Sequence, residues 1–107
     1  MTKIDVIGIK LEVTDQIQNK VESTFKKLIK KEGNGYNFSR VEVKIKTEKG
    51  NHIAECLAHV SGMPNIKAKA DSDDMYKTIS LLKDKVESQY DKFKVNLKGK
   101  DSIKNID

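Results

Sequence analysis

The most chemically reactive side chains in this chain are one cysteine, Cys56, and two histidines, His52 and His59. All three lie in a segment whose pattern predicts a β-strand, on which successive side chains point to opposite faces. Cys56 and His59 are three residues apart and the histidines are seven apart, so both pairs are split between the faces. This spacing argues against a cysteine–histidine dyad and against a shared metal ion. We interpret Cys56 as a small core residue and His59 as a surface imidazole.

The carboxylates of Asp71, Asp73 and Asp74 could ligate a hard cation, but no glycine-punctuated loop or later glutamate completes a calcium pattern. Negative charge at the start of the following helix is the better account, because helix N-termini are electropositive. The chain also lacks a phosphate-cradling glycine loop and a C-x-x-C pair. We therefore predict that the protein is not an enzyme and has no metal site and no cofactor.

The remaining chemistry is anion binding by lysines. Two segments with apolar residues at helical spacing carry lysines on one side of the buried stripe. These are Lys20, Lys27 and Lys31 in the first segment and Lys85 and Lys92 in the second. Charge sorted in this way suggests an anionic partner, because a helix that needs only solubility more often intersperses signs. Lys26 follows Glu22 by one turn, and we predict that these two form a surface pair.

Two helices are expected to position these lysines. The first begins after the N-cap Thr14 and ends near Lys31. The second begins at Asp71-Ser72-Asp73, whose side chains supply N-cap chemistry, and continues to Lys94. Their apolar stripes contain Ile17, Val21, Phe25, Leu28 and Ile29 in the first and Met75, Ile79, Leu82, Val86, Tyr90 and Phe93 in the second.

Four strands are expected at residues 3–10, 40–48, 52–60 and 66–70, where apolar and polar residues alternate. The element order is then β-α-β-β-β-α. A right-handed crossover makes the first two strands parallel, and two hairpins make the last three antiparallel. We predict an α+β fold, a two-layer sandwich in which two helices cover one face of a four-stranded mixed sheet.

Composition fits a single small domain. The chain has 107 residues, a net charge of +5 and one cysteine, which rules out an internal disulfide. No apolar run approaches the roughly 20 residues that span a bilayer, and Asp5 interrupts any signal-peptide core. We expect a cytoplasmic protein without a membrane or small-molecule partner, with one domain at residues 1–94 and a flexible tail at 95–107.

The second helical segment has a specific motif, Ala68-x-Ala70-x-x-x-Asp74-Met75-Tyr76-x-x-Ile79-x-x-Leu82-x-x-Lys85-Val86-x-x-Gln89. It resembles the ribosome hibernation promoting factor and ribosome-associated inhibitor family. The opening of the chain is also similar, at Ile4-x-Val6-x-Gly8, Val13-Thr14-x-x-Ile17, Val21 and Phe25-x-Lys27-Leu28. The resemblance covers residues 1 to about 94, and it indicates the short form of the family.

The resemblance implies a bacterial stress factor that binds ribosomal RNA in the decoding region of the small ribosomal subunit, blocks messenger and transfer RNA, and silences translation. It implies a basic groove between the helices formed by Lys27, Lys30, Lys85 and Lys92; Lys20 and Lys31 join this set by geometry. The chain departs from the family pattern at Thr24, Ser80 and Ser88, which weakens single contacts.

Two alternatives remain open. A double-stranded RNA-binding module has a similar α-β-β-β-α core and would bind plain duplexes. A protein-interaction domain with solvated basic helices is the other. The tail is too short for the dimerisation domain of long family members, so it stays open whether the protein pairs ribosomes, only inactivates them, or is a fragment of a longer chain. We expect a monomer away from the ribosome.

Overall fold

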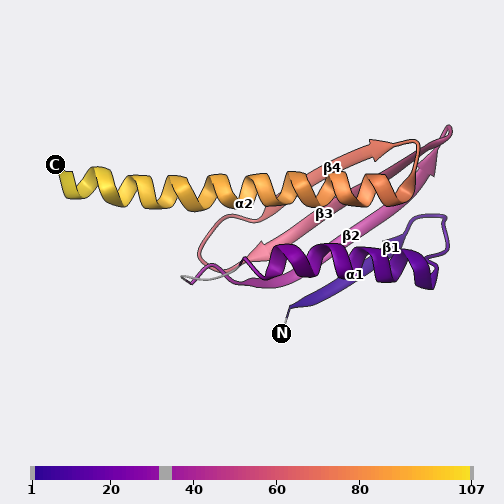
Figure 1. Cartoon of the computed structure of the whole chain (residues 1–107), viewed down its shortest axis with the longest axis horizontal. Helices are drawn as coiled ribbons and strands as arrows, with labels where there is room; N and C mark the ends of the chain where they lie inside the picture. The colour runs from indigo at the N-terminus through magenta and orange to yellow at the C-terminus, as the bar shows by residue number, and fades with distance from the viewer. Residues whose placement is uncertain (1, 32–34, 107) are drawn as a thin grey trace.

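The computed structural model describes residues 2–31 and 35–106, with side chains as far as Asn96. The elements are β1 (Lys3–Gly8), α1 (Asp15–Ile29), β2 (Phe38–Glu48), β3 (Asn51–Val60), β4 (Ile66–Ser72) and α2 (Met75–Ile106). The sheet order is β1-β2-β3-β4, with β1 parallel to β2 and the other pairs antiparallel. Figure 1 shows both helices on one side of this sheet. The predicted α+β fold with its mixed sheet is confirmed.

The core lies between the sheet and the two helices. Val41, Val43 and Ile45 of β2 are fully buried on the helix side, as their alternation predicts. The helices contribute Val21, Phe25 and Leu28 from α1 and Ile79, Leu82, Val86 and Tyr90 from α2. Burying a side chain of this size contributes about 1.5 to 3 kcal/mol, so this layer is the main source of stability.

The predicted cap of α1 is confirmed. Thr14 has an extended backbone, and its Oγ1 accepts a hydrogen bond from the Ile17 backbone N–H at 3.2 Å. Asp15 adds negative charge in the first turn, where the free N–H groups attract it. With the helix starting here, Val21 and Phe25 of α1 point into the core and the lysines of α1 lie on its other sides.

The predicted start of α2 is wrong by one to three residues. β4 continues to Ser72, which pairs with His52 of β3, because the long β3 offers a ladder that overrides the local capping preference. Asp74 is the cap instead: its Oδ1 accepts from the Tyr76 N–H at 3.3 Å. Thr78 Oγ1 then donates to the His52 carbonyl at 3.0 Å, which ties the first turn of α2 to β3.

The first strand ends at Gly8 rather than near Lys10. Ile9 N–H still donates to the Ile45 carbonyl at 2.8 Å, but the chain turns away immediately afterwards. A Cβ atom at position 8 would collide with the Leu11 carbonyl oxygen, so the turn requires glycine there. The short β1 therefore delivers the chain to Thr14 and the start of α1.

α2 is helical to Ile106 and extends past the end of the sheet, well beyond the expected domain end at Lys94 (Figure 1). The proposed boundary at residue 94 and the proposed mobility of residues 95–107 stay predictions. Within the part of the chain that the structure describes, neither helix has the apolar length that a bilayer span requires.

Cys56 provides a test of the strand faces. Its side chain is 4% exposed in the core, and burial, with a smaller contribution from the Glu42 charge, raises the pKa of its thiol to about 12. Only the thiolate is reactive, and at pH 8 it is present in roughly one molecule in 10⁴. We expect Ellman's reagent to label the native protein very slowly and the urea-unfolded protein at once. Rapid stoichiometric labelling before unfolding would show that Cys56 faces solvent.

Candidate nucleic-acid interface

The structure gives no catalytic or metal-binding constellation among the described residues. Cys56 is buried on the helix side, whereas His59 lies opposite Arg40 on the other face of the sheet. No group of three or more His, Cys, Asp or Glu side chains in the described ranges could hold a metal ion.

The lysines of the first helix form the α1 lysine surface, which we define as Lys20, Lys27 and Lys30. Lys27 and Lys30 are exposed and Lys20 is half-buried. None of the three is in an ion pair with a described residue. The buried side of α1 holds the helix against the core, so these ammonium groups are presented to solvent without a competing carboxylate.

Lys26 is a further unpaired lysine of α1 among the described residues, although the sequence predicts that it pairs with Glu22. The predicted Lys26–Glu22 pair is absent, since Gln18 Nε2 donates to Glu22 Oε1 at 3.1 Å instead. Lys26 is exposed and has no ion-pair partner among the residues described. The i,i+4 spacing that argued for a pair could not show that a neutral side chain competes for the same carboxylate.

Lys31 lies beside this surface but is already paired. Its Nζ donates to Glu87 at 3.0 Å and to Asp91 at 2.8 Å, both on α2. The hydrogen bond to Asp91, followed by that to Glu87, raises the pKa of Lys31. The hydrogen bonds that Glu87 accepts from Lys31 and Lys83 lower the pKa of Glu87. Lys31 therefore joins the two helices, whereas its predicted role in RNA binding stays a prediction.

Lys85 and Lys92 do not face α1. Lys85 Nζ donates to the Lys69 carbonyl of β4 at 2.8 Å, and Gln89 Nε2 donates to the Lys67 carbonyl at 2.7 Å. Lys92 is exposed and follows Lys85 by seven residues, which places it on the same side of the helix. The side of α2 that faces α1 carries Glu87 and Asp91. The interpretation of one groove lined by lysines of both helices is thus wrong in its geometry.

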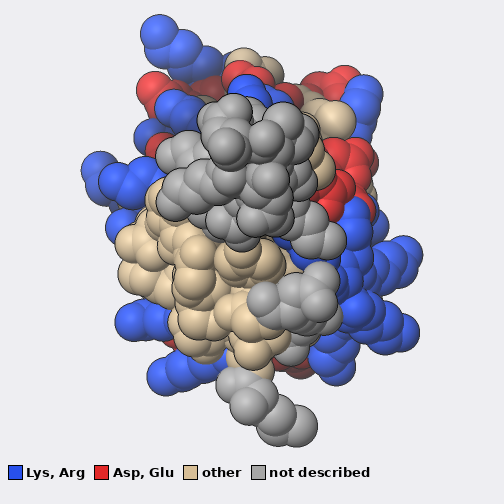
Figure 2. Space-filling model, turned by 90° about the vertical axis from the view of Figure 1, so that its left-hand side faces the viewer, with Lys and Arg blue, Asp and Glu red and all other residues tan. Residues whose placement is uncertain are grey.

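The open face of the sheet is also rich in lysine, but carboxylates lie among its cations and pair with several of them. Arg40 pairs with Asp5 at 3.3 Å, and longer contacts of 3.6 to 4.0 Å join Arg40 to Glu42, Lys46 to Glu48 and Lys69 to Glu55. Figure 2 shows that Lys and Arg side chains gather on two opposite flanks of the molecule. Charge balance makes the open face a weaker attractant for a polyanion than the α1 lysine surface.

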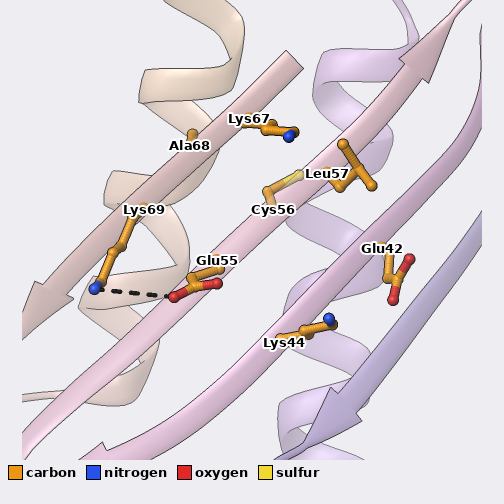
Figure 3. A pocket seen from close by; sticks show the side chains of 8 residues that line it. All are labelled: Glu42, Lys44, Glu55, Cys56, Leu57, Lys67, Ala68 and Lys69. Carbon is orange, nitrogen blue, oxygen red and sulfur yellow. Dashed lines mark ion pairs between the residues drawn. The ribbon is translucent and has the colours of Figure 1, made fainter. Parts of the chain in front are cut away.

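A shallow hollow of about 490 Å³ lies on this open face. It is lined by six residues whose side chains lie on the open face, Glu42, Lys44, Glu55, Leu57, Lys67 and Lys69, and by Cys56 and Ala68, which belong to the same strands but face the helices. Figure 3 shows carboxylates and ammonium groups interspersed around Leu57, with Glu55 and Lys69 paired. The mixture of signs provides no concentrated site for an anion.

These features define a small two-layer α+β module with exposed, unpaired lysines on its first helix among the described residues. Residues 4–98 match the family described as sigma 54 modulation protein / S30EA ribosomal protein, and the chain belongs to this family. Membership places the protein among ribosome hibernation factors, which are not enzymes.

Its similarity to named members covers nearly the whole chain. The ribosome hibernation promoting factor of Salmonella typhimurium is 33% identical over 96 residues, which are 90% of this chain and 97% of the relative. That of Azotobacter vinelandii is 34% identical over 86% of this chain and 82% of the relative. The ribosome hibernation promotion factor of Lactococcus lactis is 32% identical over 94% of this chain, which spans only 54% of that relative.

Solved structures agree with the fold. A ribosomal subunit interface protein from Coxiella burnetii superposes with a TM-score of 0.75 and 27% identity, over 89% of this chain and 99% of that one. The N-terminal domain of Thermus thermophilus Protein Y superposes with a TM-score of 0.76 and 24% identity, over 87% and 99% of the two chains. The second likeness supports the arrangement of strands and helices alone.

Proposed function

We propose that this protein binds the small ribosomal subunit in the bacterial cytoplasm, occupies the decoding region and inhibits translation as a hibernation factor. The observation that supports this most directly is the α1 lysine surface, whose ammonium groups lack ion pairs among the described residues, on a chain of this family. Ribosomal RNA supplies the phosphates that such a surface binds.

The mechanism requires no reaction. Each lysine that contacts an RNA phosphate releases condensed counterions, which drives association at physiological salt. The folded domain then excludes messenger and transfer RNA from the space that it fills. Its buried core makes the domain a rigid obstacle rather than a chain that RNA could displace segment by segment.

A sedimentation experiment tests the proposal. We expect the purified protein to co-sediment with small ribosomal subunits at low salt and to lower protein synthesis in a reconstituted translation system without any added cofactor. Binding should weaken steeply as salt rises, because phosphate contacts dominate. Recovery of the protein only in the ribosome-free fraction at low salt would overturn the assignment. Equal affinity for a plain RNA duplex would instead favour a free-standing double-stranded RNA-binding module.

A further inference from the structure

The two helices are joined along their solvent side by a cluster of charged residues that α1 and α2 share. Lys31 Nζ contacts Glu87 and Asp91 at 3.0 and 2.8 Å, and Lys83 Nζ contacts Glu87 and Asp84 at 3.0 and 3.2 Å. Two lysines therefore meet three carboxylates. The local balance of charge is negative, in contrast to the α1 lysine surface beside it.

Lys31 would otherwise extend that surface. Lys20, Lys27 and Lys31 follow one another at spacings of seven and four residues, which keeps them on the same side of the chain. That side faces α2, since Tyr76 of α2 donates from its hydroxyl to Gln16 Oε1 at 3.3 Å near the other end of α1. The cationic row thus runs along the boundary with α2, and its last member is neutralised there.

We propose that Glu87 and Asp91 are specificity-determining residues, which hold the Lys31 ammonium away from phosphate and repel RNA from the α2 side of the boundary. This inference rests on the proposed function and concerns which RNA the protein binds. A protein discriminates between partners by repulsive as well as attractive elements. RNA that spreads across both helices meets the carboxylates, whereas RNA that follows α1 alone does not. The pair therefore disfavours unselective binding to arbitrary RNA.

The effect of removing the two carboxylate charges on the salt dependence of RNA binding follows from these contacts. In the variant E87Q/D91N, the amides keep the size of the carboxylates and remove their charge, so Lys31 becomes available for one further phosphate. For single-stranded RNA, the slope of log affinity against log salt should then steepen by about 0.7. Adding K31A to this variant should return the slope to the wild-type value, because the released cation is gone.

The experiment measures the binding of poly(U) RNA and of small ribosomal subunits across a salt series. The variants are E87Q/D91N, K31A/E87Q/D91N and the single D91N, whose half-exposed side chain can change with the least structural disturbance. The matched control is E48Q/E55Q, which removes the same charge from the open face, where these residues pair with Lys46 and Lys69. Circular dichroism and a thermal melt establish that each variant is folded.

The proposal expects E87Q/D91N to gain more affinity for poly(U) than for small subunits, the control to gain little, and K31A to cancel the change in slope. D91N alone should show a smaller gain in the same direction. An unchanged slope in folded E87Q/D91N, or an equal gain in the control, would overturn it. If neither the wild-type protein nor any variant binds small subunits, the proposed function fails. The inference that Glu87 and Asp91 select between RNA partners then fails with it. In that case the slope for poly(U) still shows whether Lys31 has been released.

Discussion

Replacing Lys20, Lys27 and Lys30 together with alanine is expected to weaken binding to small ribosomal subunits by roughly 100- to 500-fold at about 0.1 M salt. Each lost phosphate contact removes about 0.7 to 0.9 from the slope of log affinity against log salt, so three contacts remove about 2 to 3. These residues have no ion pair among the described parts of the chain. Their loss therefore removes binding energy without leaving a carboxylate unpaired.

The matched control is the triple variant K3A/K44A/K67A. These lysines are exposed on the open face of the sheet and likewise lack an ion pair within the described ranges, so the change in formal charge and the loss of pairing are the same. We expect a much smaller loss of affinity. Both variants should retain their stability to within about 0.5 kcal/mol, as measured by urea denaturation, because surface replacements of this kind disturb little. Equal losses would mean that the protein binds as a diffuse polycation.

Features that depend on neighbours in the sequence could be predicted. The alternation of Val41, Val43 and Ile45 reports which face of β2 is buried, because the side-chain period of a strand is fixed. The Thr14 side chain accepts a hydrogen bond from the N–H group of Ile17, only three residues further along the chain. The parallel pairing of β1 and β2 follows from the handedness of a crossover connection.

The arrangement of the lysines could not be predicted in the same way. A helical wheel places each side chain relative to the buried stripe of its own helix, but it does not state on which side the neighbouring helix lies. Lys31 meets Glu87 and Asp91, which are 56 and 60 residues away. The helical wheel places Lys85 beside the buried stripe of α2, yet only the order of the strands shows that this side faces β4. Long-range packing therefore decides which lysines are free.

The second large effect that we expect is on stability, from the replacement of Tyr90 by alanine. Tyr90 is fully buried, its ring stacks on Phe38 with centroids 4.9 Å apart, and its hydroxyl donates to the Tyr36 carbonyl at 3.0 Å. Removing a buried aromatic side chain costs about 3 to 5 kcal/mol, through lost burial and the cavity left behind. Because domains of this size are stable by only about 5 to 15 kcal/mol, the variant should be close to unfolding.

Tyr90→Phe separates the two contributions of this residue. Phenylalanine keeps the ring between α2 and β2 but leaves the Tyr36 carbonyl without its donor, so the free energy of unfolding should fall by only about 1 kcal/mol. Urea denaturation followed by circular dichroism measures both variants. The Tyr90 hydroxyl also lies 3.5 Å from the Lys31 carbonyl, beside the contact between the helices. A loss below about 1 kcal/mol for Tyr90→Ala would show that the packing of α2 does not depend on this side chain.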